Sequence, residues 1–322
     1  MSAGPVISVV IPHHGDPGPT LTLLSRLHSQ VPAQHLIVVD DGSATPFPEV
    51  DGAVVVRRER NGGFGSAVNS GAAVASGDLL LVLNSDLHVP DDLIARMIEA
   101  HWRHPRAVLS PRVLDPEGVG TWVGRDFPRV HHQVVEWLTP LARWRDTSAW
   151  HRGVGHHVGA LHTDAIVDWV MGAAMLIPLD DFRAVGGFDE RFFMNCEEVD
   201  LQRRLHERGL VSVALASPDV VHEGGGSSPQ QQRRTWLVES RLTYAEKWGS
   251  VRLLQAALTA AIGMIVLSGL PMPYHPVFNV DRFTMASSDK FFLVIESTDP
   301  KFGGAAAFLR ETGAKGVYDV AE

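Results

Sequence analysis

The sequence contains only one cysteine, Cys196, so no disulfide can form within the chain. An excess of positive charge is also missing: the formal net charge is −9, which argues against a general nucleic-acid-binding protein. The chain does not open with a basic region followed by an apolar run, which is the pattern of a secretory signal. These absences together predict a reducing, cytoplasmic location and no nucleic-acid partner.

Two nucleotide-binding signatures are absent or incomplete. No Gly-Lys-Ser or Gly-Lys-Thr triplet occurs, which excludes the P-loop pattern. The segment Gly63–Val68 begins like a dinucleotide-binding loop, but Val68 stands where close helix packing needs Gly or Ala. This loop also follows the third predicted strand instead of the first. A dehydrogenase or a nucleotidyltransferase on a similar sheet is therefore the weaker alternative.

What the sequence does contain is an alternation of apolar strands with helices. The strands are predicted over residues 6–11, 35–39, 54–57, 79–83 and 211–215. The run Leu79–Leu83 is entirely apolar, which is typical of a strand buried on both faces of a parallel sheet. The alternation predicts an α/β fold with a doubly wound, mostly parallel sheet and flanking helices.

Acidic residues follow two of these strands directly. Asp40 and Asp41 come at the end of the second strand, and Asp86 follows the fourth. Because open α/β sheets bind ligands outside the carboxyl ends of their strands, these acids are predicted to line a binding crevice. A simple turn-capping role is the alternative for Asp86. Pro90 is predicted to halt the chain's extended segment, and Asp91 to be the N-cap of the helix that follows.

A second group of chemically active residues lies later in the chain. Glu197, Glu198 and Asp200 open an amphipathic helix, and His222 stands before a glycine-rich loop. The helix macrodipole by itself favours acids in a first turn, and this explains one or two of the three. A histidine beside a glycine loop is a candidate metal ligand.

Two pairs of adjacent histidines and the single cysteine are given structural interpretations. His131–His132 and His156–His157 are predicted to be exposed loop residues, because neighbouring side chains in a strand point to opposite faces and seldom share an ion. Cys196 is predicted to be a small buried hydrophobe.

Six ordered motifs resemble those of family-2 inverting glycosyltransferases with the GT-A fold, and above all their rhamnosyltransferase-like members. The motifs are Val39–Ser43, Asn61–Gly65, Asn84–Asp86, Gly187–Glu190, Glu197–Asp200 and the loop at His222. The resemblance implies a nucleotide-diphospho-sugar donor with rhamnose as the expected sugar, a glycan or lipid-linked acceptor, and Mg²⁺ or Mn²⁺.

The resemblance also implies roles for individual residues. Asp40 is expected to hydrogen-bond the nucleotide base, Asp86 to bind the metal, and His222 to complete the metal site. Glu198 takes the position of the catalytic base, and Glu197 is the reserve candidate because the family more often has Asp there. The other nucleotide-binding positions are Pro12, His13, Asp41, Asn61, Gly63 and Ser85.

Two departures from the family pattern concern the predicted site itself. The first strand ends in His13-His14-Gly15 where the family usually has Thr-Tyr-Asn, and Asn84 replaces the first acid of the D-x-D motif. The second departure leaves Asp86 as the one metal carboxylate expected from this motif. One base and one metal nevertheless suffice for a single displacement with inversion.

The C-terminal part has a different character. Leu253–Leu270 are 18 residues without a charge, the lower limit for a membrane span, with a buried or interfacial helix as the alternative. The last 60 residues or so resemble a fragment of the membrane subunit of bacterial alternative complex III. We predict a glycosyltransferase domain at 1–250, an apolar helix and candidate membrane segment at 251–271, and a tail at 272–322. Attachment to the inner face of the cell membrane is expected, with a membrane-attached assembly subunit as the alternative function.

Overall fold

The computed structural model describes residues 4–137, 144–224, 230–249 and 251–267. The chain divides into two compact units, Met1–Gln255 and Ala256–Glu322. Of the second unit, the described residues are 256–267, which form the larger part of one helix, so the architecture below is that of the first unit.

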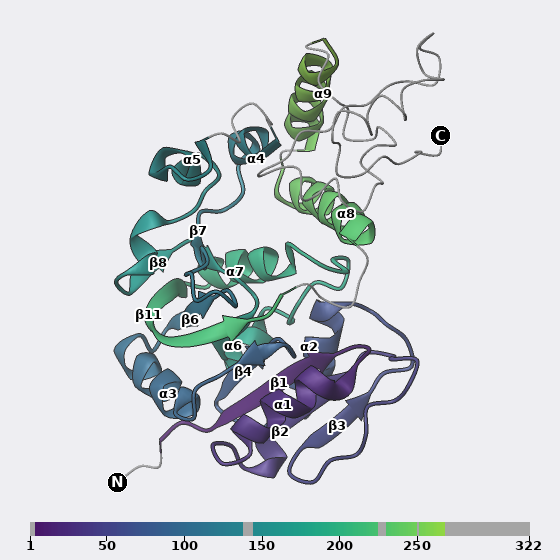
Figure 1. Ribbon diagram of the computed structural model, residues 1–322, viewed down its shortest axis with the longest axis vertical. Helices are drawn as coiled ribbons and strands as arrows, with labels where there is room; N and C mark the ends of the chain where they lie inside the picture. Colours follow the sequence, from purple (N-terminus) through teal and green to yellow (C-terminus); the bar gives the residue numbers. More distant parts are fainter. Residues whose placement is uncertain (1–3, 138–143, 225–229, 250, 268–322) are drawn as a thin grey trace, which may run out of the picture. The chain divides into compact units, whose positions relative to one another are not determined.

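Two sheets form the framework of the first unit (Figure 1). Their strands are β1 Ile7–His13, β2 Leu36–Asp40, β3 Val54–Arg57, β4 Leu79–Leu83, β5 Leu87–His88, β6 Ala107–Leu114, β7 Gly124–Arg125, β8 Ala165–Val167, β9 Trp169–Val170, β10 Ala174–Pro178 and β11 Val211–His222. In the described residues, nine strands form a mixed sheet of order β3-β2-β1-β4-β10-β6-β11-β5, with β8 paired to β11. The strands β7 and β9 form a separate antiparallel pair.

Helices flank the main sheet (Figure 1). The helices in the described residues are α1 Pro17–Leu27, α2 Phe64–Val74, α3 Leu93–Arg103, α4 Val130–Trp137, α5 Ser148–Gly153, α6 Leu179–Ala184, α7 Glu197–Glu207, α8 Gln230–Trp248 and α9 Val251–Leu267, most of which belongs to the second unit. Their apolar residues pack on the strands: Leu23, Leu24 and Leu27 of α1 and Met97 of α3 are almost fully buried.

The central strands are parallel, as their unbroken apolar composition predicts. β1 pairs in parallel with both β2 and β4, and every residue of β2 and β4 is buried. β10 is the exception, because it runs antiparallel between β4 and β6. β4 and β6 both run antiparallel to β10, and β11 is parallel to β6. The carboxyl ends of β4, β6 and β11 therefore lie along one edge of the sheet.

Several element boundaries differ from those predicted. β1 continues to His13, so this histidine belongs to the strand instead of the loop. The N-cap of α3 is Asp92 and not Asp91, and the Asp92 carboxylate pairs with Arg96 one turn along the helix at 2.7 Å. β11 extends seven residues beyond the predicted Leu215, since it resumes its pairing with β6 after a register shift between Ala214 and Asp219.

The histidine pairs are more buried than predicted. His132 lies on α4 and is 7% exposed, and its ring contacts that of His131 at 4.2 Å between centroids. His156 is half-buried, and its Nδ1 lies 3.1 Å from Nδ1 of His151. The prediction of exposed residues was wrong for His132, His156 and His157, because aromatic side chains of this segment pack on one another, whereas His131 is exposed as predicted, although on a helix.

The predicted apolar span is not confirmed. Residues 251–267 form α9, whereas residues 268–270 and the predicted tail at 272–322 lie outside the described residues. None of the helices in the described ranges combines the length and the apolar character that a membrane crossing requires.

Candidate active site

Asp40 lies at the carboxyl end of β2 with its side chain fully buried. Its carboxylate accepts hydrogen bonds from the backbone N–H of Ser43 and Phe47, both at 2.9 Å, and pairs with Arg57 at the end of β3. Burial alone would raise the pKa of Asp40, but these hydrogen bonds and the charge of Arg57 hold it below its usual range. The ionised carboxylate therefore organises the loop after β2.

Asp41 holds the glycine-rich loop against the same edge. Its carboxylate accepts hydrogen bonds from the backbone N–H of Gly62 at 3.1 Å and of Gly63 at 2.9 Å, and it pairs with Arg58 at 3.2 Å. Gly63 has a φ of 86°, and a Cβ there would collide with the carbonyl oxygen of Phe193. Only glycine fits this position, so the loop is drawn close to the 188–193 segment.

The predicted nucleotide positions gather around this edge. His13 stands opposite Asp40 in the pairing of β1 with β2, and Pro12 precedes it. The His13 ring accepts or donates a hydrogen bond at 2.8 Å to Thr20, while its Nε2 is buried without a partner in the described structure. Ser85 is half-buried beside Asp86, and Asn61 is exposed.

Asp86 and His222 meet although they are far apart in sequence. The Oδ1 atom of Asp86 lies 3.1 Å from Nε2 of His222, and Nδ2 of Asn84 lies 3.3 Å from the same nitrogen. Burial would raise the pKa of Asp86, but the hydrogen bond and charge of His222 keep it below its usual range. The loop after β4 and the end of β11 thus bring together one carboxylate, one imidazole and one amide.

This donor set fits a divalent cation. Carboxylate and amide oxygens are hard ligands that Mg²⁺ and Mn²⁺ accept, and such ions keep several waters and substrate phosphates in their shell. A cluster of three or more His, Cys, Asp or Glu side chains is absent from the described residues. Asp86, His222 and Asn84 alone would leave most coordination positions of such a cation to water or to a bound phosphate.

Glu197 and Glu198 begin α7, directly after two residues of left-handed backbone, Asn195 and Cys196. Glu197 is buried and Glu198 half-buried. Burial raises the pKa of both carboxyls, and repulsion from Glu198 raises that of Glu197 further. One oxygen of each side chain is buried without a hydrogen-bond partner in the described structure.

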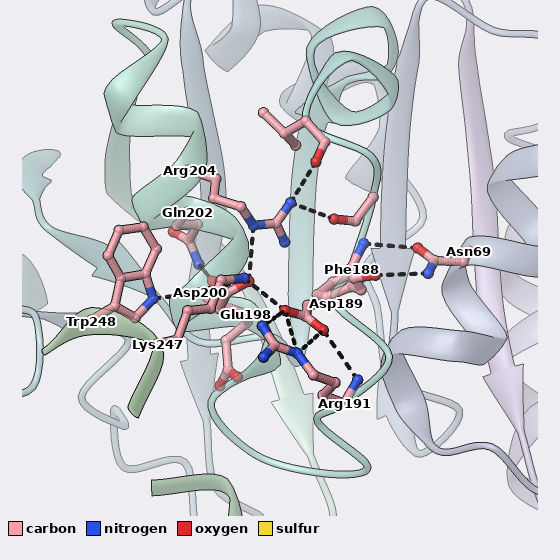
Figure 2. A network of polar contacts seen from close by, with 12 residues as sticks. Asn69, Phe188, Asp189, Arg191, Glu198, Asp200, Gln202, Arg204, Lys247 and Trp248 are labelled. Atoms are coloured by element: carbon pink, nitrogen blue, oxygen red, sulfur yellow. Dashed lines mark hydrogen bonds and ion pairs between the residues drawn. The ribbon is translucent and has the colours of Figure 1, made fainter. Parts of the chain in front are cut away.

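The third acid of this turn, Asp200, has a structural role. Its fully buried carboxylate accepts hydrogen bonds from Arg204 at 2.9 Å and from the Trp248 indole at 3.0 Å, and it pairs with Lys247 at 2.7 Å. Lys247 also pairs with Asp189 at 2.7 Å, as Figure 2 shows. This network joins α7 to α8 and to the 187–191 loop, while Glu198 points away from it (Figure 2).

The 187–191 loop is tied in turn to the glycine-rich loop. The amide of Asn69 on α2 donates to the carbonyl of Phe188 at 2.9 Å and accepts from its backbone N–H at 2.8 Å. Phe188 also packs edge-on against Phe64, with 5.8 Å between ring centroids. The segment that leads into Glu197 and Glu198 is therefore fixed to the edge that holds Asp41.

Three cations at or near this site were not predicted as site residues. Arg57 is the last residue of β3 and Arg58 follows it at the same sheet edge, and their position at the end of a strand is a signal that the sequence contains. Arg125 on β7 acts electrostatically on Glu198, but it lies in a segment without periodicity that offers no such signal.

Known proteins resemble this chain in two separate regions. Residues 8–156 match the family described as Glycosyl transferase family 2, and residues 251–319 match the ActD subunit of alternative complex III. The chain is 29% identical over 230 residues to the N-acetylglucosaminyl-diphospho-decaprenol L-rhamnosyltransferase of Mycobacterium tuberculosis (strain H37Rv), an alignment that covers 65% of this chain and 73% of that protein. It is 24% identical over 218 residues to rhamnosyltransferase WbbL of Escherichia coli (strain K12), and this alignment covers 64% of this chain and 78% of that protein.

A solved structure shares the fold. The crystal structure of GalNAc-T7 with UDP, GalNAc and Mn²⁺ superposes with a TM-score of 0.50 at 17% sequence identity, and the match covers 84% of this chain. This chain spans 59% of the length of that one. The protein is therefore a glycosyltransferase with a GT-A-like fold, and its residues 8–156 match glycosyl transferase family 2.

Proposed function

We propose that the protein transfers a sugar from a nucleotide-diphospho-sugar to a hydroxyl of a lipid-linked or cell-wall glycan, with inversion at the anomeric carbon. The observation that carries this proposal is the convergence of Asn84, Asp86 and His222 at the carboxyl edge, from positions up to 138 residues apart. A diphosphate leaving group needs its charge neutralised at such an edge, and the crevice outside parallel strands is where it would bind.

Asp86 and His222, with Asn84 beside them, are the residues proposed to hold a divalent metal. When bound, Mg²⁺ or Mn²⁺ would neutralise the charge on the diphosphate as it leaves. Asp40 and Asp41 are proposed to shape the nucleotide pocket, with Asp40 near the base and Pro12, His13, Asn61, Gly63 and Ser85 as further lining positions. Arg57 and Arg58 add positive charge next to these acids.

Glu198 is proposed to be the catalytic base. Its carboxylate takes the proton from the acceptor hydroxyl while that oxygen forms a bond to the anomeric carbon and the bond to the diphosphate oxygen breaks. The half-buried side chain and its unpartnered oxygen support this role, because an acceptor hydroxyl could donate to that oxygen. Glu197 is less exposed and stays the reserve candidate.

The donor and acceptor are proposed from the relatives. Both relatives compared above are named as rhamnosyltransferases, and one name specifies a decaprenol-linked acceptor. We therefore propose dTDP-rhamnose as the first donor to test and a polyprenyl-diphosphate glycan as the acceptor. An acceptor of this kind would bring the protein to the cytoplasmic surface of a membrane.

Metal removal tests the proposed function. We expect a screen of nucleotide-sugars to find one donor that is hydrolysed or transferred, and chelation by EDTA to lower that rate by at least about tenfold, because the leaving charge loses its counter-ion. Added Mn²⁺ or Mg²⁺ should restore the rate. Metal-independent turnover, release of inorganic pyrophosphate, or reduction of a nicotinamide cofactor would each contradict the proposal.

The match of residues 251–319 favours a second candidate function for that part of the chain, attachment to a membrane-associated assembly. We expect a chain that ends after Gln255 to fold and to bind nucleotide with unchanged affinity, since the compact first unit ends there. Calorimetric titration with the nucleotide measures this against the full chain. Aggregation of the shortened chain or loss of nucleotide binding would assign residues 256–322 to the transferase.

A further inference from the structure

We propose that Arg125 is a positioning residue that keeps Glu198 in the ionised form that a base needs. The inference rests on the proposed function of Glu198 and adds to it a residue that no motif indicates. It is carried by the contacts that hold both residues against the segment 169–172.

One edge of β9 holds Arg125. In the pairing of β7 with β9, Arg125 stands opposite Trp169, and the backbone N–H of Met171 donates to the carbonyl of Val123 at 3.1 Å. The Arg125 guanidinium donates from Nε to the carbonyl of Trp122 at 3.0 Å and lies 5.4 Å from the centre of the Trp169 ring. These contacts fix the cation to β9.

The same strand also holds the first turn of α7. The buried amide of Gln202 accepts from the backbone N–H of Val170 and donates to its carbonyl, both at 2.8 Å, and donates to the carbonyl of Glu198 at 3.1 Å. A Cβ on Gly172 would lie 3.7 Å from Cγ of Glu198, so Glu198 packs over this glycine. A second guanidinium nitrogen of Arg125 lies 3.5 Å from the sulfur of Met171. Arg125 and Glu198 thus flank Met171 and Gly172.

The charges around this pair favour the proposed role. Burial raises the pKa of Glu198, and this rise is opposed by hydrogen bonds from the backbone N–H groups of Glu198 and Val199 and by the charge of Arg125, the one cation that acts on this carboxyl in the described residues. The other titratable groups that face Glu198 or Arg125 are Glu197, Cys196, Glu136, Arg241 and His156, whose pKa is lowered to about 3 by burial and by the charge of Arg125, so that it adds no charge. Arg241 on α8 is paired with Glu136 on α4 at 2.7 Å, so these two largely cancel, while Glu197 and Cys196 add no positive charge.

The pH dependence of kcat/KM tests the inference. An opposite charge nearby commonly shifts a carboxyl pKa by about one unit or more. We therefore expect Arg125→Met to lower kcat/KM by about tenfold on the acid side of the profile and to recover towards wild type as the pH rises. Arg125→Lys should keep most of the wild-type profile, and the KM for the donor should stay unchanged in both. Arg96→Met, which removes an exposed arginine on α3, is the control for net charge.

A titration that does not depend on turnover separates this inference from the proposed function. In protein labelled with ¹³C at the glutamate carboxyls, the resonance missing from Glu198→Gln identifies Glu198. The midpoint of its titration should move to higher pH in Arg125→Met. If Arg125→Met does not fold, Arg125→Gln replaces it and should show the same shift. An unchanged midpoint in a folded neutral variant would overturn the role of Arg125, whatever the transfer rates. An active Glu198→Gln would instead refute the base assignment and leave the titration result standing.

Discussion

Glu198→Gln is expected to lower the rate of sugar transfer by about 10²–10⁴-fold, the usual contribution of a general base. The substitution keeps the size of the side chain at the start of α7 but removes the proton acceptor. Nucleotide affinity should stay within about threefold of wild type, because the base acts mainly in the transition state. Burial raises the pKa of Glu198, so this carboxylate is protonated at a higher pH than an exposed glutamate. When the pH is lowered, wild-type activity should therefore be lost at that higher pH.

The competing explanation is that Glu198 only stabilises the helix N-terminus, which is worth about 0.3–1 kcal/mol. In that case the variant would melt slightly earlier and remain active. Glu197→Gln is the matched control one residue away. If it is inactive while Glu198→Gln is active, the base is Glu197, and the unpaired buried oxygen of Glu197 would be the group that meets the acceptor.

Much of the framework could be predicted because local sequence determines it. The unbroken apolar runs of β2 and β4 have no solvent-facing alternative, so they predict buried parallel strands. Acids placed directly after such strands indicate the carboxyl edge, and Asp86 does lie there beside His222. The antiparallel direction of β10 could not be predicted, because an antiparallel strand buried on both faces has the same apolar pattern as a parallel one.

Long-range pairing explains what the sequence left open. Asp200 resembles its neighbours in the first turn of α7, but Lys247 and Trp248 on α8 occupy its carboxylate, and nothing local to either segment indicates that contact. The proposed action of Arg125 on Glu198 depends on Gln202, which ties α7 to β9. The role of an acid in such a cluster depends on its partners, which the spacing of acids within one helical turn does not specify.

Asp86→Asn is expected to lower kcat/KM by about 10²-fold or more, the scale of a lost charge-stabilising contact, and to raise the metal concentration needed for half-maximal rate. The variant leaves two amides, Asn84 and the new side chain, beside His222, and neither supplies the negative charge that attracts a divalent cation. His222→Ala should cause a smaller loss, because water can replace an imidazole as a ligand. Initial rates over a series of Mn²⁺ concentrations measure both effects.

The control is Asp91→Asn, which removes one negative charge from an exposed carboxylate paired with Arg26 and should leave rates and metal dependence at wild-type values. A hydrogen-bonding role for Asp86 makes a different prediction. If Asp86 serves only to orient His222 at 3.1 Å, the asparagine amide would largely replace it, and His222→Ala would be the more damaging change. If Asp86→Asn has the same metal dependence as wild type, the cation binds elsewhere along the carboxyl edge. If the metal requirement shifts in that variant alone, the Asp86 carboxylate is the principal ligand.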